Sequence, residues 1–100
     1  MLFDNENLKT MPPLYEQDGK GDEAIVHIVV SIPNTKYVWL LEEYSPKEGI
    51  FFGFTCINDI QCAELGYISK AELESLSKNC NLVVEKVNMT LQEAKKKYIG

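Results

Sequence analysis

Glu42 and Glu43 are the carboxylates in this sequence best placed to do chemistry, because they lie inside the apolar segment VWLLEEY. Paired carboxylates act as general acid and base when both point into one site. Adjacent residues in a strand point to opposite faces, so these two are not expected to cooperate. We expect one of them to face inward or to line a pocket, and that one is the most interesting carboxylate here.

The cysteines and the single histidine raise the possibility of a metal site or a nucleophile, and they are Cys56, Cys62, Cys80 and His27. Structural zinc sites use close cysteine pairs with about two to four residues between them, and this sequence has no such pair. A Cys/His nucleophile and base require a proximity that spacing alone does not establish. We therefore predict no metal, no cofactor and no catalytic residue, and we interpret His27 as a hydrogen-bonded histidine within a strand.

Two short motifs near the N-terminus each have a ligand-binding interpretation. Pro12-Pro13-Leu14-Tyr15 matches the PPxY pattern read by WW-type domains. The favoured interpretation is that the diproline stiffens the approach to the first strand while Leu14 and Tyr15 pack into the domain. Gly19-Lys20-Gly21-Asp22 resembles the end of a phosphate loop, but the first glycine of that loop is missing and Gly21 replaces the required Ser or Thr. We interpret these glycines as a mobile turn without a ligand.

Size and charge exclude several classes of protein. A chain of 100 residues with 45% hydrophobic residues buries one core, which indicates a single domain. The formal charge of −5 and the absence of arginine disfavour direct binding of nucleic acid. No apolar run approaches the roughly 18 residues of a membrane helix. An odd number of cysteines and the lack of a signal peptide predict a reduced, cytoplasmic protein that does not associate with membranes.

Five segments have the composition of strands, and the short loops between the first three favour antiparallel hairpins. A continuous apolar run makes the first of them a central strand. The predicted ranges are 24–32, 37–44, 50–57, 64–68 and 82–87.

Helix signals lie at three places in the sequence. Asp4 as N-cap, with Phe3 and Leu8 as a hydrophobic staple, predicts a short first helix that ends before Pro12. The segment 69–72 (SKAE) is a capping box that starts a second helix, and Asn79 is predicted to end it in a left-handed conformation. A second capping box at 90–93 (TLQE) starts a C-terminal helix with three lysines near its end.

These elements predict an α+β fold: a single small domain with an antiparallel sheet of four to five strands and two or three helices packed on one face. We divide the chain into an N-terminal helix and leading segment (1–12), a core (13–87) and a C-terminal helix (88–100). The predicted core residues are Val26, Ile28, Val30, Trp39, Leu41, Phe52, Phe54, Leu73 and Leu76.

The order of the motifs PPLY, GKGDEAIV, VWLLEEY, IFFGF, ELGYIS and KAELESL resembles the family catalogued as domain of unknown function 2958, over about residues 8 to 87. The segment 55–63 is longer than in the family pattern, and the C-terminus is shorter and richer in lysine. The resemblance implies a product of phages, plasmids or conjugative elements, often encoded near antirestriction genes, and brings no activity with it. The matching positions are Pro13, Tyr15, Gly21, Asp22, Trp39, Glu43, Tyr44, Phe52, Gly53, Glu64, Gly66 and Tyr67.

Two functions from different classes are expected. The leading hypothesis is a small acidic, non-enzymatic protein that binds a macromolecule, such as a counter-defence inhibitor of the anti-CRISPR or antirestriction type. The alternative is a protein that binds or hydrolyses a small ligand such as a nucleotide, gripped by aromatic residues near carboxylates. The candidate binding residues are Asp18, Asp22, Glu23, Trp39, Glu43, Tyr44, Glu64 and Tyr67.

The acidic turn at residues 16–23 indicates the kind of macromolecular partner. Four carboxylates and one lysine lie in this segment, and negative patches steer basic partners. We therefore expect a host or phage protein with a basic surface, contacted by the acidic turn and by the insert at residues 55–63. Neutralising Asp18, Asp22 and Glu23 together is expected to slow association.

Overall fold

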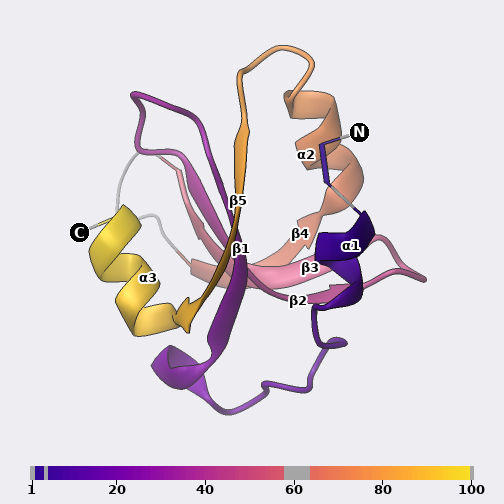
Figure 1. Ribbon diagram of the computed structural model, residues 1–100, viewed down its shortest axis with the longest axis vertical. Coiled ribbons are helices and arrows are strands. Elements are labelled where there is room, and N and C mark those ends of the chain that lie inside the picture. Colours follow the sequence, from indigo (N-terminus) through magenta and orange to yellow (C-terminus); the bar gives the residue numbers. More distant parts are fainter. Residues whose placement is uncertain (1, 4, 58–63, 100) are drawn as a thin grey trace.

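The strands of this protein form one antiparallel sheet in the order β4-β3-β2-β1-β5 (Figure 1). The computed structural model describes residues 2–3, 5–57 and 64–99. Within these residues the strands are β1 (Ile25–Ser31), β2 (Val38–Ser45), β3 (Ile50–Cys56), β4 (Glu64–Ser69) and β5 (Val83–Thr90). The helices are α1 (Asn5–Lys9), α2 (Lys70–Leu76) and α3 (Leu91–Tyr98), with a 3-10 turn, η1 (Gly21–Glu23).

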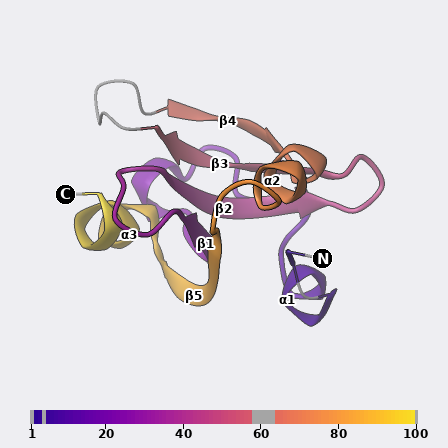
Figure 2. The ribbon, with the colours of Figure 1, turned by 90° about the horizontal axis from the view of Figure 1, so that it is seen from above.

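The predicted strands and their antiparallel pairing are confirmed. The first four strands are consecutive neighbours because their connections are short, as hairpins require. After β4 the chain passes through α2 and returns as β5 beside β1, so β1 has neighbours on both sides as predicted. Figure 2 shows β4 and β5 at opposite margins of the sheet.

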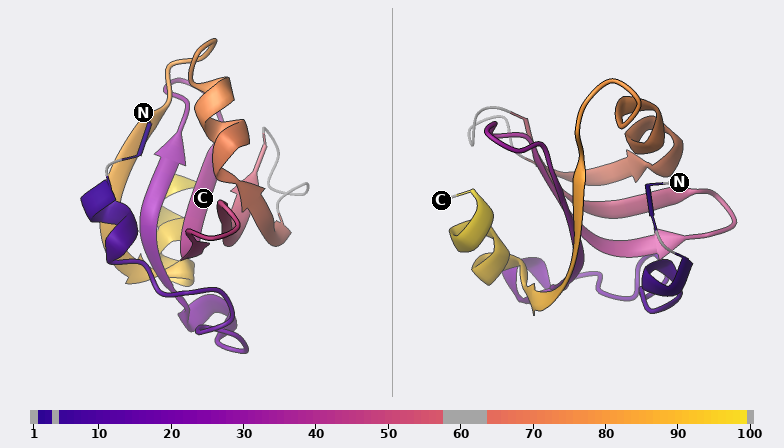
Figure 3. Two further views of the ribbon diagram at one scale, coloured as in Figure 1. Left: turned by 90° about the vertical axis from the view of Figure 1, so that its right-hand side faces the viewer. Right: turned by 45° about the horizontal axis from the view of Figure 1, so that its top comes forward.

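The helices lie on both faces of the sheet, which corrects the prediction that they share one face. The left view of Figure 3 shows α1 and α2 in front of the strands and α3 behind them. Leu8 of α1 and Leu73 of α2 belong to one core cluster, whereas Leu91 and Ala94 of α3 belong to a second. The prediction was wrong because β1 and β2 carry apolar side chains on both faces, and each face needs a cover.

Most of the predicted core is buried. The exceptions are Phe52 and Leu76, which are partly exposed. The first cluster also contains stacked aromatic rings, with ring centroids 5.0 Å apart for Phe3 and Phe51 and 4.7 Å apart for Tyr44 and Phe51. This packing places Tyr44 firmly in the core on the face that α1 and α2 cover.

Both predicted helix starts are confirmed by hydrogen bonds. The Ser69 hydroxyl accepts from the Glu72 N–H at 3.2 Å, and Thr90 and Glu93 form the complete reciprocal capping box. The predicted left-handed end of α2 at Asn79 is wrong, because positive φ angles occur among the described non-glycine residues only at Tyr15 and Asn34. The Ser77 and Lys78 N–H groups instead donate to carbonyls of the last helical turn.

Some predictions lie outside the described residues, namely the Asp4 N-cap, Cys62 and positions 58–63 of the insert. Among the residues that are described, none of the helices has the length and apolar character needed to cross a membrane.

Candidate functional site

A β-bulge in β2 turns Glu42 and Glu43 toward the same side of the sheet. The pairing with β3 shifts by one residue between the pairs Leu41↔Gly53 and Glu43↔Phe52, so β2 carries one extra residue there. Leu41 and Tyr44 consequently face the same core although they are three positions apart. The two glutamates line one pocket and are each only 3% exposed. The prediction that they point to opposite faces was wrong because strict alternation fails at a bulge.

Gly53 is the residue on β3 that accommodates this bulge. A Cβ atom at position 53 would collide with the carbonyl oxygen of Leu40 and would lie 3.0 Å from the Leu41 Cα. Glycine inside a strand often marks such a close approach of two backbones. A glycine inside an apolar strand, as at Gly53, is the sequence feature that marks this close approach, but it does not identify the strand that approaches.

The segment between α1 and β1 is held over the bulge by the side-chain amide of Gln17. Gln17 Nε2 donates to the Ile25 carbonyl at 2.9 Å and to the Glu42 carbonyl at 3.1 Å. Its Oε1 accepts from the Ile25 N–H at 2.6 Å. The register between β1 and β2 runs only as far as Ile28↔Leu41, so this buried amide joins the two strands where they separate.

Glu43 fixes the same segment through two backbone hydrogen bonds. The Tyr15 N–H donates to Oε1 at 2.9 Å, and the Gln17 N–H donates to Oε2 at 2.6 Å. Tyr15 reaches this position with φ at +73°, a left-handed conformation that costs a non-glycine residue about 1–3 kcal/mol. The strained conformation of Tyr15 therefore accompanies the hydrogen bonds that this segment donates to the Glu43 carboxylate.

Aromatic side chains form the outer wall of the site. The Tyr67 hydroxyl donates to the Tyr15 hydroxyl oxygen at 3.1 Å, and the rings of Phe52 and Tyr67 meet edge to face with centroids 5.5 Å apart. The hydrogen bond to Tyr15, with the nearby charges of Asp18 and Glu43, raises the pKa of the Tyr67 hydroxyl. The volume of the pocket is about 150 Å³. We call this site the acid–aromatic pocket and define it by Tyr15, Asp18, Glu42, Glu43, Phe52 and Tyr67.

Glu42 is the electrostatically unusual group of the acid–aromatic pocket. Burial, followed by the neighbouring charge of Glu43, raises the pKa of Glu42 from 4.5 to about 7, against a smaller opposing effect of Lys95. Its Oε2 is buried and has no hydrogen-bond partner among the described residues. A buried carboxyl group with a pKa near 7 can gain or lose a proton at neutral pH, which is a common property of groups in functional sites.

The predicted binding residues divide into three groups: those in the acid–aromatic pocket, those in the core, and acidic residues outside the pocket. Asp18, Glu43 and Tyr67 meet in the acid–aromatic pocket, as the alternative hypothesis requires of a carboxylate and an aromatic ring. Trp39 and Tyr44 are buried in the core on the opposite face, where α1 and α2 cover the sheet. These two side chains therefore do not contribute to the pocket.

The acidic residues outside the pocket have other surroundings. The Asp22 carboxylate forms an ion pair with Lys95 of α3 at 2.9 Å. Glu23 lies exposed in η1, and Glu64 lies exposed on β4. Sequence reasoning overlooked Gln17, Phe52 and Leu65 as residues of the site, because their proximity depends on the loop and on the pairing of β3 with β4.

The PPLY motif is part of the fold. The Pro12 carbonyl accepts from the Tyr44 N–H at 3.0 Å, and the Pro13 carbonyl accepts from the Glu16 N–H at 3.3 Å. Leu14 is partly buried, whereas Tyr15 is 65% exposed and lines the pocket. A WW-type groove reads an extended polyproline segment, and the left-handed Tyr15 does not have that conformation.

Cys56, Cys80 and His27 have unrelated environments. Cys56 is buried in the core under α3, Cys80 follows α2, and His27 lies in β1 at a second bulge, between Val26 and Ile28. Burial and the charge of Lys86 lower the pKa of His27. The described part of the chain contains no group of three His, Cys, Asp or Glu side chains that could hold a metal ion.

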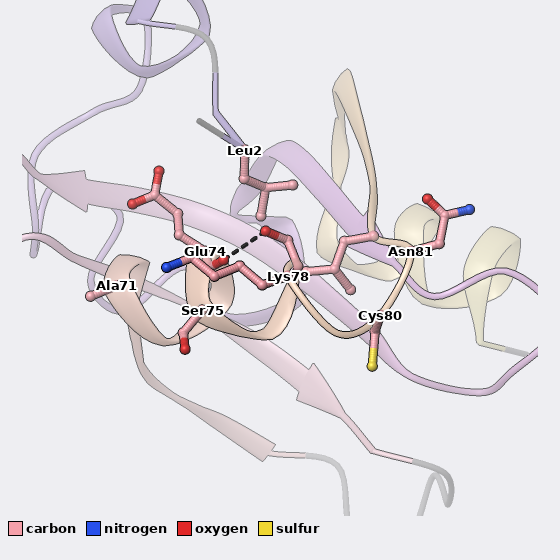
Figure 4. Close-up of a pocket in the computed structure, with 9 residues that line it drawn as sticks. Leu2, Ala71, Glu74, Ser75, Lys78, Cys80 and Asn81 are labelled. Carbon is pink, nitrogen blue, oxygen red and sulfur yellow. Dashed lines mark hydrogen bonds between the residues drawn. The ribbon is translucent and has the colours of Figure 1, made fainter.

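A second, larger hollow of about 690 Å³ runs along α2 and the turn that follows it (Figure 4). Figure 4 shows the Cys80 sulfur on the turn after α2, pointing away from Leu2. Glu74, which lines this groove, forms an ion pair with Lys70 at 3.6 Å, and its Oε2 is buried without a hydrogen-bond partner among the described residues. None of the predicted binding residues lines this groove, so the acid–aromatic pocket is the better candidate site.

Comparison with known proteins yields a family and no activity. The model of the family described as "Protein of unknown function (DUF2958)" matches residues 6–96. The chain belongs to this family. No curated protein and no solved structure matches the chain. The function must therefore be argued from the site itself.

Proposed function

We propose that this protein is a non-enzymatic binding protein whose acid–aromatic pocket docks on a basic surface of a macromolecular partner. The observation that carries the proposal is the pair of buried glutamates that the β2 bulge brings to one pocket. Glu43 already holds the backbone of Tyr15 and Gln17, but Glu42 Oε2 has no hydrogen-bond partner among the described residues, and burying such a carboxylate destabilises the folded protein. A cation supplied by a partner would offset that cost.

The lining of the pocket supports a cationic ligand. Three carboxylates, those of Asp18, Glu42 and Glu43, line the pocket together with the aromatic rings of Tyr15, Phe52 and Tyr67. Rings of Tyr and Phe attract cations through their quadrupole, most strongly where water is excluded. The formal charge of −5 also favours encounter with a basic protein surface.

The nucleotide alternative has less support. Trp39 and Tyr44, which were to grip the base, face the opposite core, and the described lining of the pocket contains no Lys or His side chain to meet phosphates. Phosphate groups would lie against Glu42 and Glu43 and be repelled. Thermal unfolding against a panel of nucleotides tests this alternative, because a ligand at saturation raises the unfolding temperature.

Within the class of binding proteins, we favour a counter-defence inhibitor that acts in the bacterial cytoplasm. The motif resemblance to products of phages and plasmids supports this choice, as does the acidic surface. Nucleases of defence systems hold nucleic acid in basic grooves, and an acidic protein that occupies such a groove would inhibit the enzyme. The same reasoning leaves no role for direct binding to nucleic acid or to membranes.

Affinity capture from a bacterial lysate tests the proposed function. The wild-type protein is expected to retain a basic protein that the double variant Tyr67→Ala, Asp18→Asn loses, since both side chains are exposed and line the pocket. The matched control is Val83→Ala with Glu48→Gln, an exposed apolar residue and an exposed acid elsewhere. Equal retention by the pocket variant and the control would show that the pocket is not the docking site.

The acidic turn is expected to contribute mainly to the rate of association. Asp22 is already paired with Lys95, so the free negative charge in this segment comes from Asp18, Glu16 and Glu23. Neutralising Asp18 and Glu23 is expected to slow association with the captured partner at low salt and to flatten its salt dependence. An unchanged association rate at low salt would exclude electrostatic steering by the turn.

A further inference from the structure

The free oxygen of Glu42 defines what the acid–aromatic pocket lacks. Glu42 is 3% exposed, lines the pocket, and has an Oε2 atom without a hydrogen-bond partner among the described residues. Buried polar atoms in folded proteins nearly always have partners, so this exception requires an explanation. When Glu42 is ionised, its oxygens only accept hydrogen bonds, and the ligand that suits the ionised form is therefore a donor.

The two glutamates together determine which kind of donor fits. Both oxygens of Glu43 already accept backbone N–H groups, from Tyr15 and Gln17. An arginine guanidinium binds best to a carboxylate that offers both oxygens side by side. Neither glutamate offers such a pair here: both oxygens of Glu43 are occupied, and Glu42 Oε2 is enclosed by the fold, so a ligand reaches Glu42 through Oε1. A compact ammonium group, with three donors that point in different directions, suits this arrangement better.

The walls and the volume of the pocket fit an alkyl chain that ends in such a group. Phe52 and Leu65 provide apolar surface next to the carboxylates, and the rings of Tyr15 and Tyr67 stand at the side. The volume of about 150 Å³ is well above the roughly 10–15 Å³ that one water molecule needs in a cavity. The methylenes and the ammonium of one lysine side chain therefore have room in the pocket.

We propose that the acid–aromatic pocket binds one primary alkylammonium group, the end of a lysine side chain on the partner, with the Glu42 carboxylate as its acceptor. This inference rests on the proposed function and names the group that the partner inserts. No bond is made or broken, and the only coupled event is the release of the proton that Glu42 holds at neutral pH.

Proton release makes binding depend on pH in a defined direction. The charged and titratable groups around Glu42 are Glu43 on the same strand, Asp18 in the loop, Tyr67 on β4 and Lys95 on α3. The pKa of Glu42 is about 7, so its ionised fraction rises about tenfold between pH 6 and pH 8. The affinity for an ammonium ligand is expected to rise by about the same factor.

The experiment follows the Tyr15 and Gln17 backbone amide signals by NMR during titration, because both N–H groups donate to Glu43 inside the site. The probes are n-butylammonium, N-acetyl-lysine methylamide and N-acetyl-arginine methylamide. We expect saturable shifts with the two ammonium probes and at least fivefold weaker binding of the arginine probe. Glu42→Gln should weaken lysine binding at least tenfold at pH 8, whereas the exposed control Glu48→Gln should not change it.

Three results would overturn the inference: no saturable shift with either ammonium probe, equal affinity for the lysine and arginine probes, or unchanged lysine binding by Glu42→Gln. Tyr67→Leu, at an exposed position, gives a second variant that should also weaken binding while the protein stays folded. Failure here is distinguishable from failure of the proposed function. A pocket that binds lysine in a protein that captures no partner refutes only the function, and a pocket-dependent partner without lysine binding refutes only this inference.

Discussion

Replacing Glu42 by glutamine is expected to stabilise the protein at alkaline pH relative to acidic pH. Burial and the charge of Glu43 raise the pKa of Glu42 from 4.5 to about 7, so the folded state holds a proton that the unfolded state releases. The resulting stabilisation is complete below pH 4.5 and is lost as the pH rises through 7. The difference between 7 and 4.5, at about 1.36 kcal/mol for each pH unit, amounts to about 3 kcal/mol.

Urea unfolding at pH 5 and at pH 8.5 measures this effect: the change in the free energy of unfolding caused by Glu42→Gln is determined at each pH, and the two changes are compared. The cost of placing an amide at position 42 is the same at both pH values and cancels when the two effects of Glu42→Gln are subtracted. The variant should therefore gain up to about 3 kcal/mol relative to the wild type between pH 5 and pH 8.5. The exposed control Glu48→Gln should gain none. If the effect of Glu42→Gln is equal at the two pH values, Glu42 does not titrate in the neutral range and the electrostatic reasoning fails.

Three further substitutions test the support of the site and the fold. Gln17→Ala should lower the free energy of unfolding by about 1–3 kcal/mol, because it leaves the Ile25 N–H without its hydrogen-bond partner. A smaller loss in urea unfolding would show that the hydrogen bonds of the Gln17 amide are not needed for stability. Gly53→Ala should lower the free energy of unfolding by about 3 kcal/mol, because the added Cβ collides with the Leu40 carbonyl oxygen. The control Gly66→Ala, with open space around it, should lower it by less than about 0.5 kcal/mol. Equal decreases in unfolding temperature for the two variants would contradict the bulge. Ser69→Ala should cost about 0.5–2 kcal/mol through loss of the cap, and an unchanged denaturation midpoint at an unchanged m-value would exclude it.

The elements of this fold were predictable because their signals are local. The β-branched run around Val26 and the capping boxes at Ser69 and Thr90 each act within a few residues, and the structure has a strand or a helix start at each of them. The distribution of helices over two faces was not predictable in this way. It depends on which apolar residues of β1 and β2 remain uncovered once the sheet has formed, which is a property of long-range packing.

The site was only partly predictable for a related reason. Glu43 and Tyr67 were identified from the sequence pattern. The role of Glu42 was missed because side chains were assumed to alternate strictly between the two faces of β2, and the bulge breaks this alternation. The bulge depends on contact between Gly53 and the backbone of β2, two segments that the sequence alone does not bring together. Gln17 was missed for the same reason, since its partners Ile25 and Glu42 belong to two different strands.

The bulge in β2 also means that the second carboxylate can be lost or gained in evolution without a change in the sheet. Loss of the single codon for Glu42 would leave Leu41 and Tyr44 two positions apart, which is the spacing at which a regular strand presents both to the same core. The remaining glutamate would still face the pocket, alone. A lineage of this family can therefore gain or lose the second carboxylate by one insertion or deletion without rebuilding the sheet. Relatives that differ at this one position are natural experiments on whether the pair, rather than the fold, is under selection.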